Sequence, residues 1–171
     1  MTQVRDCGGC VACCIAPLID DPELQKPPQT VCTHCTGTAC GIHERKPTTC
    51  SEFTCEWALG KAGTDAQRPD TVGIIESFLF DIALGLPRIL FETRVGTLKE
   101  PYAQERLKAL IAKGSCVITL EFDLTQRLIV PKRDSISKHV IQQLLADGAD
   151  IVYYDEMDTV PIEVPEPAPP G

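Results

Sequence analysis

The sequence has few aromatic residues, no excess of basic charge and no long apolar run. Aromatic side chains make up 5% of its 171 residues against 43% hydrophobic residues overall, so a buried core must be mostly aliphatic. The formal net charge of -8 argues against nucleic acid as a partner, because phosphate binding needs a basic surface. No apolar stretch approaches the roughly 20 residues that span a bilayer, so we expect no membrane partner.

The common catalytic motifs are missing as well. We find no phosphate-binding loop, no serine–histidine–aspartate set and no convincing pair of carboxylates. The N-terminus, MTQVRD, is polar and reaches the first cysteine without an apolar leader. Because export to an oxidising compartment usually needs such a leader, the expected location is the cytoplasm.

Cysteine, in contrast, is abundant and concentrated. Nine of the ten cysteines lie between Cys7 and Cys55, and four of them form the run CGGCVACC at residues 7–14. Two-residue gaps between cysteines let one tight turn aim two sulfurs at a single metal ion. A disulfide framework and free redox-active thiols are the alternatives, but the adjacent Cys13 and Cys14 suit disulfides poorly. The pattern therefore predicts a metal site.

The predicted ligands are the nine cysteines of the N-terminal third, with Cys35 as the reserve among them. They are Cys7, Cys10, Cys13, Cys14, Cys32, Cys35, Cys40, Cys50 and Cys55. Nine sulfurs exceed one tetrahedral site, and neighbouring side chains point apart, so Cys13 and Cys14 are expected to serve different metals unless one of them bridges. Zinc is the favoured metal. Iron or an iron–sulfur cluster is the alternative, because three cysteines at successive gaps of three residues are typical of bacterial ferredoxins.

The cysteine pattern resembles the YkgJ-type cysteine-cluster family, which is described as zinc- or iron-chelating and is named for C-x-x-C-x-x-C-C. The resemblance runs from Cys7 to about Asp70. Later family elements are matched by Cys32, His34 and Cys35; by Cys40, Ile42, His43, Glu44, Pro47 and Cys50; by Phe53, Cys55 and Trp57; and by Arg68, Pro69 and Asp70. The sequence departs from the family at Lys46 and Ser51, where arginine is usual. The resemblance implies metal chelation and supplies no settled reaction.

Several polar and aromatic residues near the cysteines have weaker signals. His34 and His43 could ligate a metal, and Glu44 could act as a base beside one. The preferred interpretation is that they form hydrogen bonds next to the ligands, form ion pairs, or lie on the surface. Phe53 and Trp57 are expected to cover the metal site. In the second half of the chain, Cys116 is expected to be a buried apolar thiol and His139 a structural residue.

The second half of the chain has ordinary globular patterning. Alternating apolar residues predict a half-buried strand over 88–95 and partner strands over 71–80, 116–122, 128–130 and 151–154. Helices are predicted to start at Pro101 and after Ser137, and to end at Gly114 and Gly148. Their expected inward faces are Ala103, Leu107, Leu110 and Ile111, and Val140, Ile141, Leu144 and Leu145. Residues 20–30 carry three prolines and are expected to form a loop.

The predicted fold class is α+β. A small metal-stabilised cysteine-rich segment, residues 1–70, packs on a mixed α/β portion, residues 71–155, and an irregular proline-rich tail follows over 156–171. The predicted function is that of a metal-binding protein with a closed site, which chelates zinc or iron and is not an enzyme. Its partners are expected to be metal ions and a protein that binds the α+β portion. An iron–sulfur or iron-dependent oxidoreductase is the alternative hypothesis.

Overall fold

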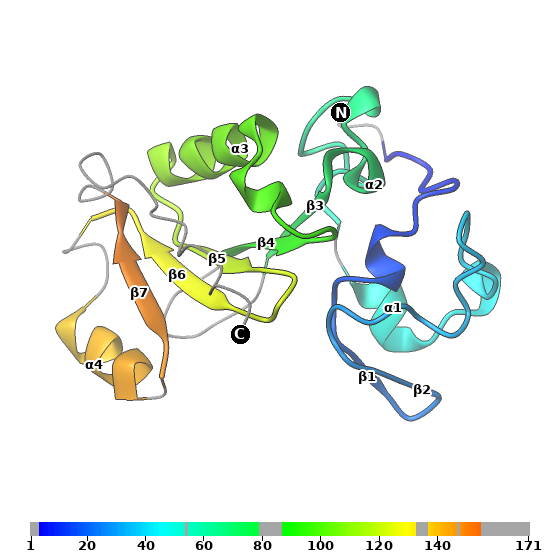
Figure 1. Ribbon diagram of the computed structural model, residues 1–171, viewed down its shortest axis with the longest axis horizontal. Helices are drawn as coiled ribbons and strands as arrows, with labels where there is room; N and C mark the ends of the chain where they lie inside the picture. The colour runs from blue at the N-terminus through cyan, green and yellow to red at the C-terminus, as the bar shows by residue number, and fades with distance from the viewer. Residues whose placement is uncertain (1–3, 54, 79–86, 133–136, 147, 155–171) are drawn as a thin grey trace, which may run out of the picture.

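The computed structural model describes residues 4–53, 55–78, 87–132, 137–146 and 148–154. Two parts can be distinguished in Figure 1. We call residues 4–62 the cysteine-rich region; it consists of turns and very short elements. We call residues 69–154 the sheet region, which is organised around a five-stranded sheet. The predicted α+β class is confirmed, and the proline-rich tail lies outside the described residues.

The cysteine-rich region contains short helical turns and one β-hairpin. Its elements are the 3-10 turn η1 (Ala12–Cys14), strands β1 (Ile19–Asp21) and β2 (Leu24–Lys26), the 3-10 turn η2 (His43–Arg45) and helix α1 (Thr48–Glu52). The prediction of a loop over residues 20–30 was wrong for its first part, because β1 and β2 pair as an antiparallel hairpin. Ile19, Asp21, Leu24 and Lys26 are the buried residues of that hairpin, so its inward face is half polar and escapes an apolar pattern search.

The sheet region follows the predicted order of strands and helices. Turn η3 (Asp65–Gln67) connects the two regions. The elements of the sheet region, in chain order, are α2 (Pro69–Val72), β3 (Ile74–Phe78), β4 (Arg88–Glu92), turn η4 (Thr97–Lys99), α3 (Pro101–Ala112), β5 (Val117–Leu120), β6 (Gln126–Val130), α4 (Lys138–Ala146) and β7 (Asp150–Tyr153). The strands lie side by side in sequence order. Pairs β3–β4 and β5–β6 are antiparallel, and pairs β4–β5 and β6–β7 are parallel.

The two long helices cover opposite faces of the sheet. Each connects two parallel neighbours, and such crossovers are right-handed in nearly all proteins. Because β5 and β6 run in opposite directions, two crossovers of the same hand must place their helices on opposite faces. Helix α3 packs on Leu90, Val117 and Ile129, whereas α4 shares the other face with the cysteine-rich region (Figure 1).

Two of the predicted strands differ from the observed ones in burial or in length. The predicted strand over 88–95 ends at Glu92 and is not half-buried, because Leu90 lies under α3 while Ile89 and Phe91 lie under the other layer. The predicted strand over 71–80 begins only at Ile74, since α2 occupies the residues before it. Its last predicted residues lie outside the described ranges.

The predicted helices are confirmed, with one error on their faces. Helix α3 buries all four predicted positions and ends before Gly114, whose φ of +78° is a left-handed value that glycine tolerates. Val140 and Ile141 of α4 pack against the sheet as predicted. Leu145 does not, since it is 54% exposed. The side chain of Leu144 is not among those described.

A buried chain of charges joins the two regions. Glu56 follows the last N-terminal cysteine, and its carboxylate accepts a hydrogen bond from Arg88 of β4 at 2.6 Å. The same Arg88 contacts Glu76 of β3 at 3.0 Å, and Glu76 in turn accepts from Arg106 of α3 at 2.6 Å. The backbone supports this contact, because the amide of Glu56 donates to the carbonyl of Glu76. The cysteine-rich region is therefore fixed to the edge of the sheet.

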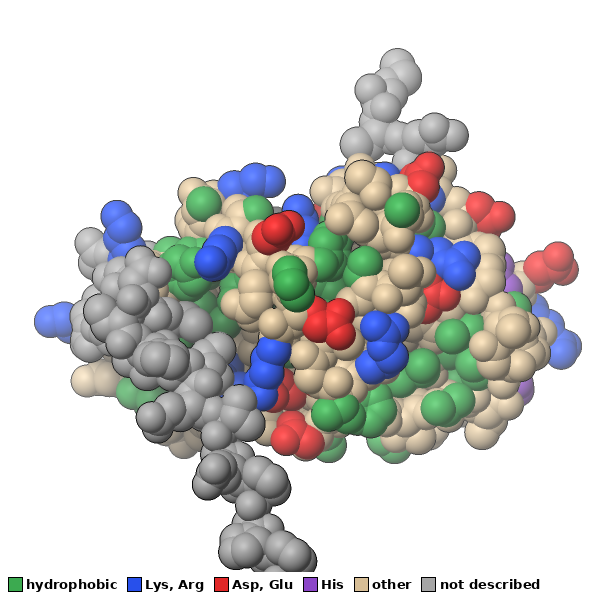
Figure 2. Space-filling model, turned by 45° about the horizontal axis from the view of Figure 1, so that its top comes forward, with side chains coloured by type: hydrophobic (Ala, Val, Ile, Leu, Met, Phe, Trp, Pro, Cys, Tyr) green, Lys and Arg blue, Asp and Glu red, His purple; other side chains and the backbone are tan. Residues whose placement is uncertain are grey.

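The surface carries charges of both signs. Lysine and arginine side chains are interspersed with aspartate and glutamate over the face shown in Figure 2. None of the helices in the described ranges is long and apolar enough to cross a membrane.

Candidate metal centre

The first cysteine group is shaped by two tight turns. The amide of Cys10 donates to the carbonyl oxygen of Cys7 at 2.9 Å, and Gly8 between them has a φ of +51°. A residue without a Cβ takes this left-handed conformation at little cost. The following turn η1 gives its last two residues different surroundings, since Cys13 is exposed and Cys14 is buried. The two adjacent thiols therefore do not share one environment.

The second cysteine group is hydrogen-bonded onto the first. The amide of Cys32 donates to the carbonyl of Cys14 at 2.8 Å, which places the start of the second group beside the end of the first. The amide of Cys35 then donates to the carbonyl of Cys32 at 2.9 Å, so this C-x-x-C segment is closed by the same kind of hydrogen bond as residues 7–10. Cys35 and Cys40 stand opposite each other in an isolated antiparallel bridge.

The remaining two N-terminal cysteines belong to α1 and the segment behind it. Cys50 is in the middle of α1. The helix is tied to the hairpin because the hydroxyl of Thr49 donates to the carboxylate of Asp21 at 3.1 Å. Cys55 follows three residues after α1 and packs against the core cluster of the sheet.

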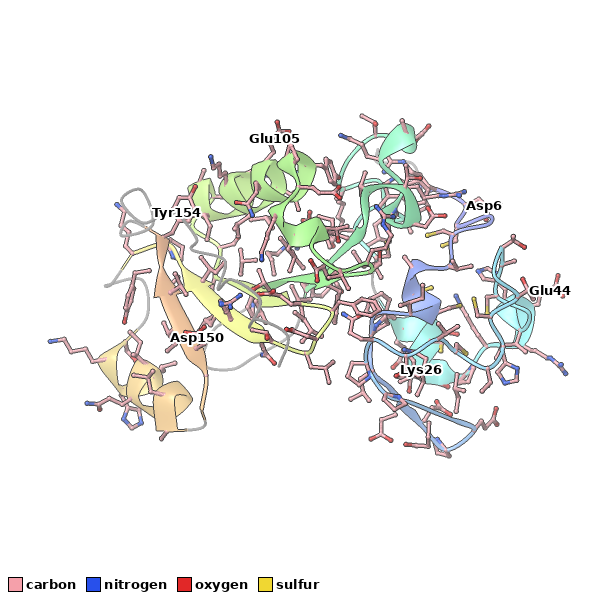
Figure 3. All side chains as sticks on the ribbon, in the orientation of Figure 1. Asp6, Lys26, Glu44, Glu105, Asp150 and Tyr154 are labelled. Atoms are coloured by element: carbon pink, nitrogen blue, oxygen red, sulfur yellow. The ribbon has the colours of Figure 1, made fainter. Side chains whose placement is uncertain are left out.

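These segments enclose one cavity of about 1040 Å³. Eight of the nine predicted cysteine ligands line it: Cys7, Cys10, Cys13, Cys14, Cys32, Cys40, Cys50 and Cys55. Cys35, the reserve ligand, does not line the cavity but packs against the cluster behind it. In Figure 3 the sulfur atoms gather in this part of the molecule, near the labelled Asp6, Lys26 and Glu44. The structure thus brings the eight thiols together around one space.

The thiols do not stand in a finished coordination shell. Within the described ranges, no three His, Cys, Asp or Glu side chains have the geometry to hold a metal ion as they are placed. The donor set nevertheless fits thiophilic metals, since soft sulfur ligands favour zinc and iron–sulfur clusters. All ten cysteines are free thiols. A zinc site would need four of these sulfurs at the usual Zn–S length of about 2.3 Å from the metal.

The environment separates the acidities of the thiols. A hydrogen bond from the thiol of Cys14 lowers the pKa of Cys13 to about 7, and Lys46 also lowers it while burial opposes the change. The same hydrogen bond raises the pKa of Cys14. Burial raises the pKa of Cys10 to about 11 and raises those of four further thiols, namely Cys7, Cys50, Cys55 and the remote Cys116. Without metal, Cys13 is therefore the readiest thiolate.

The weaker sequence candidates divide between the rim of the cavity and other places. His43 and Glu44 are exposed and line the cavity, whereas His34 is exposed and does not line it. Phe53 lines the cavity and packs on the sheet, as expected of a covering residue. Trp57 does not cover the site; it lies under the guanidinium of Arg5, and its indole N–H donates to the carbonyl of Thr64.

The two candidates of the sheet region lie away from the cavity. Cys116 is half-buried and packs against the core cluster, so it is a less completely buried apolar thiol than predicted. His139 is an exposed residue of α4.

Sequence reasoning missed one residue of the site. Lys26 lines the cavity and is only 3% exposed. It lies among prolines and polar residues, a setting that gives no signal for a buried cation.

Comparisons with known proteins add no assignment, since no protein-family model, no curated protein and no solved structure matches the chain.

Proposed function

We propose that this chain is a metal-binding protein that chelates zinc through the eight cysteines of the cavity. One observation carries the proposal: segments up to 48 residues apart in the sequence place eight thiols around one space of about 1040 Å³. Packing alone does not explain so many thiols in one place, because aliphatic side chains would fill the same space better. The resemblance to the YkgJ-type family stays a prediction that agrees with this proposal.

The eight thiols fall into two sets of four. Cys10 and Cys55 pack on the core of the sheet region. Cys14 and Cys32 instead form a separate cluster with the β1–β2 hairpin. Cys13 lies at the boundary, since its charge acts on thiols of both sets. We assign Cys7, Cys10, Cys13 and Cys55 to one subsite, and Cys14, Cys32, Cys40 and Cys50 to the other. Four thiolates match one tetrahedral zinc in each subsite.

This assignment favours chelation over hydrolysis. A hydrolytic zinc ion keeps one position open for water, and a general base stands next to it. Four thiolates close the coordination shell, and their electron density makes the metal a weaker Lewis acid. His43 and Glu44 are at the rim of the cavity, but both are exposed.

An iron–sulfur protein is the second candidate. The observation that favours it is that Cys7, Cys10 and Cys13, at successive gaps of three, all line the same cavity as Cys55. Three closely spaced cysteines and one distant cysteine are a usual ligand set of a cluster. Zinc thiolate is colourless, whereas a cluster is brown, so a spectrum of protein purified under nitrogen separates the two candidates.

The proposal is tested by metal analysis of the full chain purified anaerobically. We expect about two zinc ions per chain, because eight thiolates fill two tetrahedral sites. Cys13→Ser and Cys14→Ser should each lose about one of them, and Cys116→Ser, which changes a thiol outside the cavity, should lose none. Full metal content in both Cys13→Ser and Cys14→Ser would contradict the proposal.

A further inference from the structure

Lys26 is a buried cation whose donors are all used by the backbone. Its Nζ lies 2.5 Å from the carbonyl oxygen of Pro17, 2.9 Å from that of Ile15, and 3.1 Å from those of Pro27 and Thr30. An ammonium group has three N–H donors, so four carbonyl oxygens leave none of them unpaired. The side chain is therefore held in one place by the segment before β1 and the loop after β2.

No carboxylate in the described part of the chain forms an ion pair with this ammonium. Asp21, the buried acid of the same hairpin, accepts from Thr49 and from the amide of Glu23 instead. Burying a charge is unfavourable unless an opposite charge stands near it. Burial lowers the pKa of Lys26, and the groups that act against this effect are four thiols: Cys32, Cys14, Cys13 and Cys50. The charges that favour the protonated form of Lys26 are thus those of cavity sulfurs in their thiolate form.

Lys26 cannot bind a ligand directly, because its donors are occupied. It acts on the cavity only through its charge, which is poorly screened because the group is 3% exposed. Lys46 also lines the cavity, and its charge favours the thiolate form of Cys13. Lys46 is partly exposed, however, so solvent can screen its charge more than that of the buried Lys26. The two lysines therefore differ, because Lys26 is a buried charge held in place at the cavity wall and Lys46 is partly exposed to solvent.

We propose that Lys26 is the built-in counter-cation of the cysteine metal centre, a positioning residue that stabilises the anionic metal–thiolate state through its charge. This inference rests on the proposed function. A divalent metal with four thiolates carries a net charge of 2−, and enclosing that charge in protein needs compensation. The backbone cage of Lys26 supplies one unit of positive charge without taking a ligand position.

The test compares Lys26→Gln and Lys26→Met with Lys108→Met in the full chain. Glutamine is neutral but donates two hydrogen bonds, so it preserves part of the carbonyl cage. Lys108 is exposed on α3, and its replacement makes the same change in net charge away from the cavity. Zinc affinity is measured by chelator competition at neutral pH. The chain is also loaded with iron alone, and the Fe(III)/Fe(II) potential is determined by titration with a chemical reductant.

Both Lys26 variants should bind zinc about tenfold more weakly, and Lys108→Met should match the unchanged chain. The iron potential should fall in the Lys26 variants, because loss of a cation disfavours the more negative Fe(II) state; a tenfold effect corresponds to about 59 mV. If neither neutral variant folds, the iron potential of Lys26→Arg decides: a potential equal to that of the unchanged chain supports the inference, because the charge is kept, and a potential lower by the expected loss of about 59 mV overturns it. Zinc affinity and potential that do not change in the neutral variants also overturn it. An unchanged chain that binds neither metal instead refutes the proposed function itself.

Discussion

The two regions of this molecule are held together by different means. The sheet region buries aliphatic side chains on both faces of its sheet, with Leu90, Val117 and Val130 completely enclosed. The cysteine-rich region has one small cluster of its own, in which Ile19 and Leu24 are joined by cysteines. Apolar burial contributes about 25 cal/mol per Å², and the two larger apolar clusters are built mainly from the sheet region, so we expect that region to stay folded without metal. The cysteine-rich region has too little apolar surface for that and needs another source of stability.

Metal removal should separate the two regions most clearly. A structural zinc site supplies roughly 10–16 kcal/mol of apparent binding free energy, so the cysteine-rich region should unfold when a chelator removes the metal. Amide exchange by mass spectrometry should then show lost protection over the cysteine-rich region and retained protection over β4–β6. Native protection at residues 4–62 after verified removal of all metal would show that the cysteine-rich region does not depend on metal for its fold.

The charge chain between the regions is the next place to break them apart. Glu76 is 5% exposed and holds both Arg88 and Arg106. Glu76→Ala leaves two arginines without this partner, and breaking such a buried pair costs about 3–5 kcal/mol. The control is Arg127→Ala, whose pairs with Glu121 and Asp150 are more exposed and should contribute about 1 kcal/mol or less. Denaturant unfolding measures both, and equal losses in the two variants would refute the prediction.

A core substitution should affect the sheet region without affecting the metal. Leu90 is 0% exposed in the cluster beneath α3, on the face away from the cysteine-rich region. Leu90→Ala should cost about 2–5 kcal/mol through lost burial and a cavity. Zinc content below the unfolding transition should stay at the wild-type value. A loss of zinc from folded Leu90→Ala would show that the two regions are less independent than their cores suggest.

The sequence predicted the sheet region well because its signals are local. Apolar alternation, Pro101 and Gly114 fixed helix α3 and the order of strands. The burial of Glu92 was not predicted, because a glutamate in an alternating pattern indicates a position that faces solvent. Its carboxylate in fact accepts the amides of Leu98 and Phe122, which are six and thirty residues away. Because the amides that bind this buried carboxylate are not its sequence neighbours, the pattern of neighbouring residues cannot predict its burial.

For the site, spacing identified the cysteines but not their surroundings. The gathering of eight thiols around one cavity follows the predicted set, with the reserve Cys35 set apart. The buried state of Lys26 depends on carbonyl oxygens from two separate segments, before β1 and after β2, which no motif encodes. The position of Trp57 was also missed, since its partner Arg5 is more than fifty residues away in the sequence. Contacts of this kind depend on the assembled fold.

The smallest predicted effect concerns the boundary between the two sulfur sets. In metal-free protein, a thiol hydrogen bond from Cys14 holds the pKa of Cys13 at about 7. Because the thiolate is the nucleophile, iodoacetamide should modify Cys13 first at pH 7.5, and its rate should fall as the pH drops below 7. Cys14→Ala removes the donor, so the pKa of Cys13 should rise toward its usual value. The rate at Cys13 should then fall roughly threefold, less than the loss of thiolate alone because a more basic thiolate is the better nucleophile. Peptide mapping after brief alkylation measures this, with Cys116→Ala as the control that should leave Cys13 unchanged. Equal alkylation of Cys13 in the unchanged chain and in Cys14→Ala would show that the two neighbouring thiols are not hydrogen-bonded.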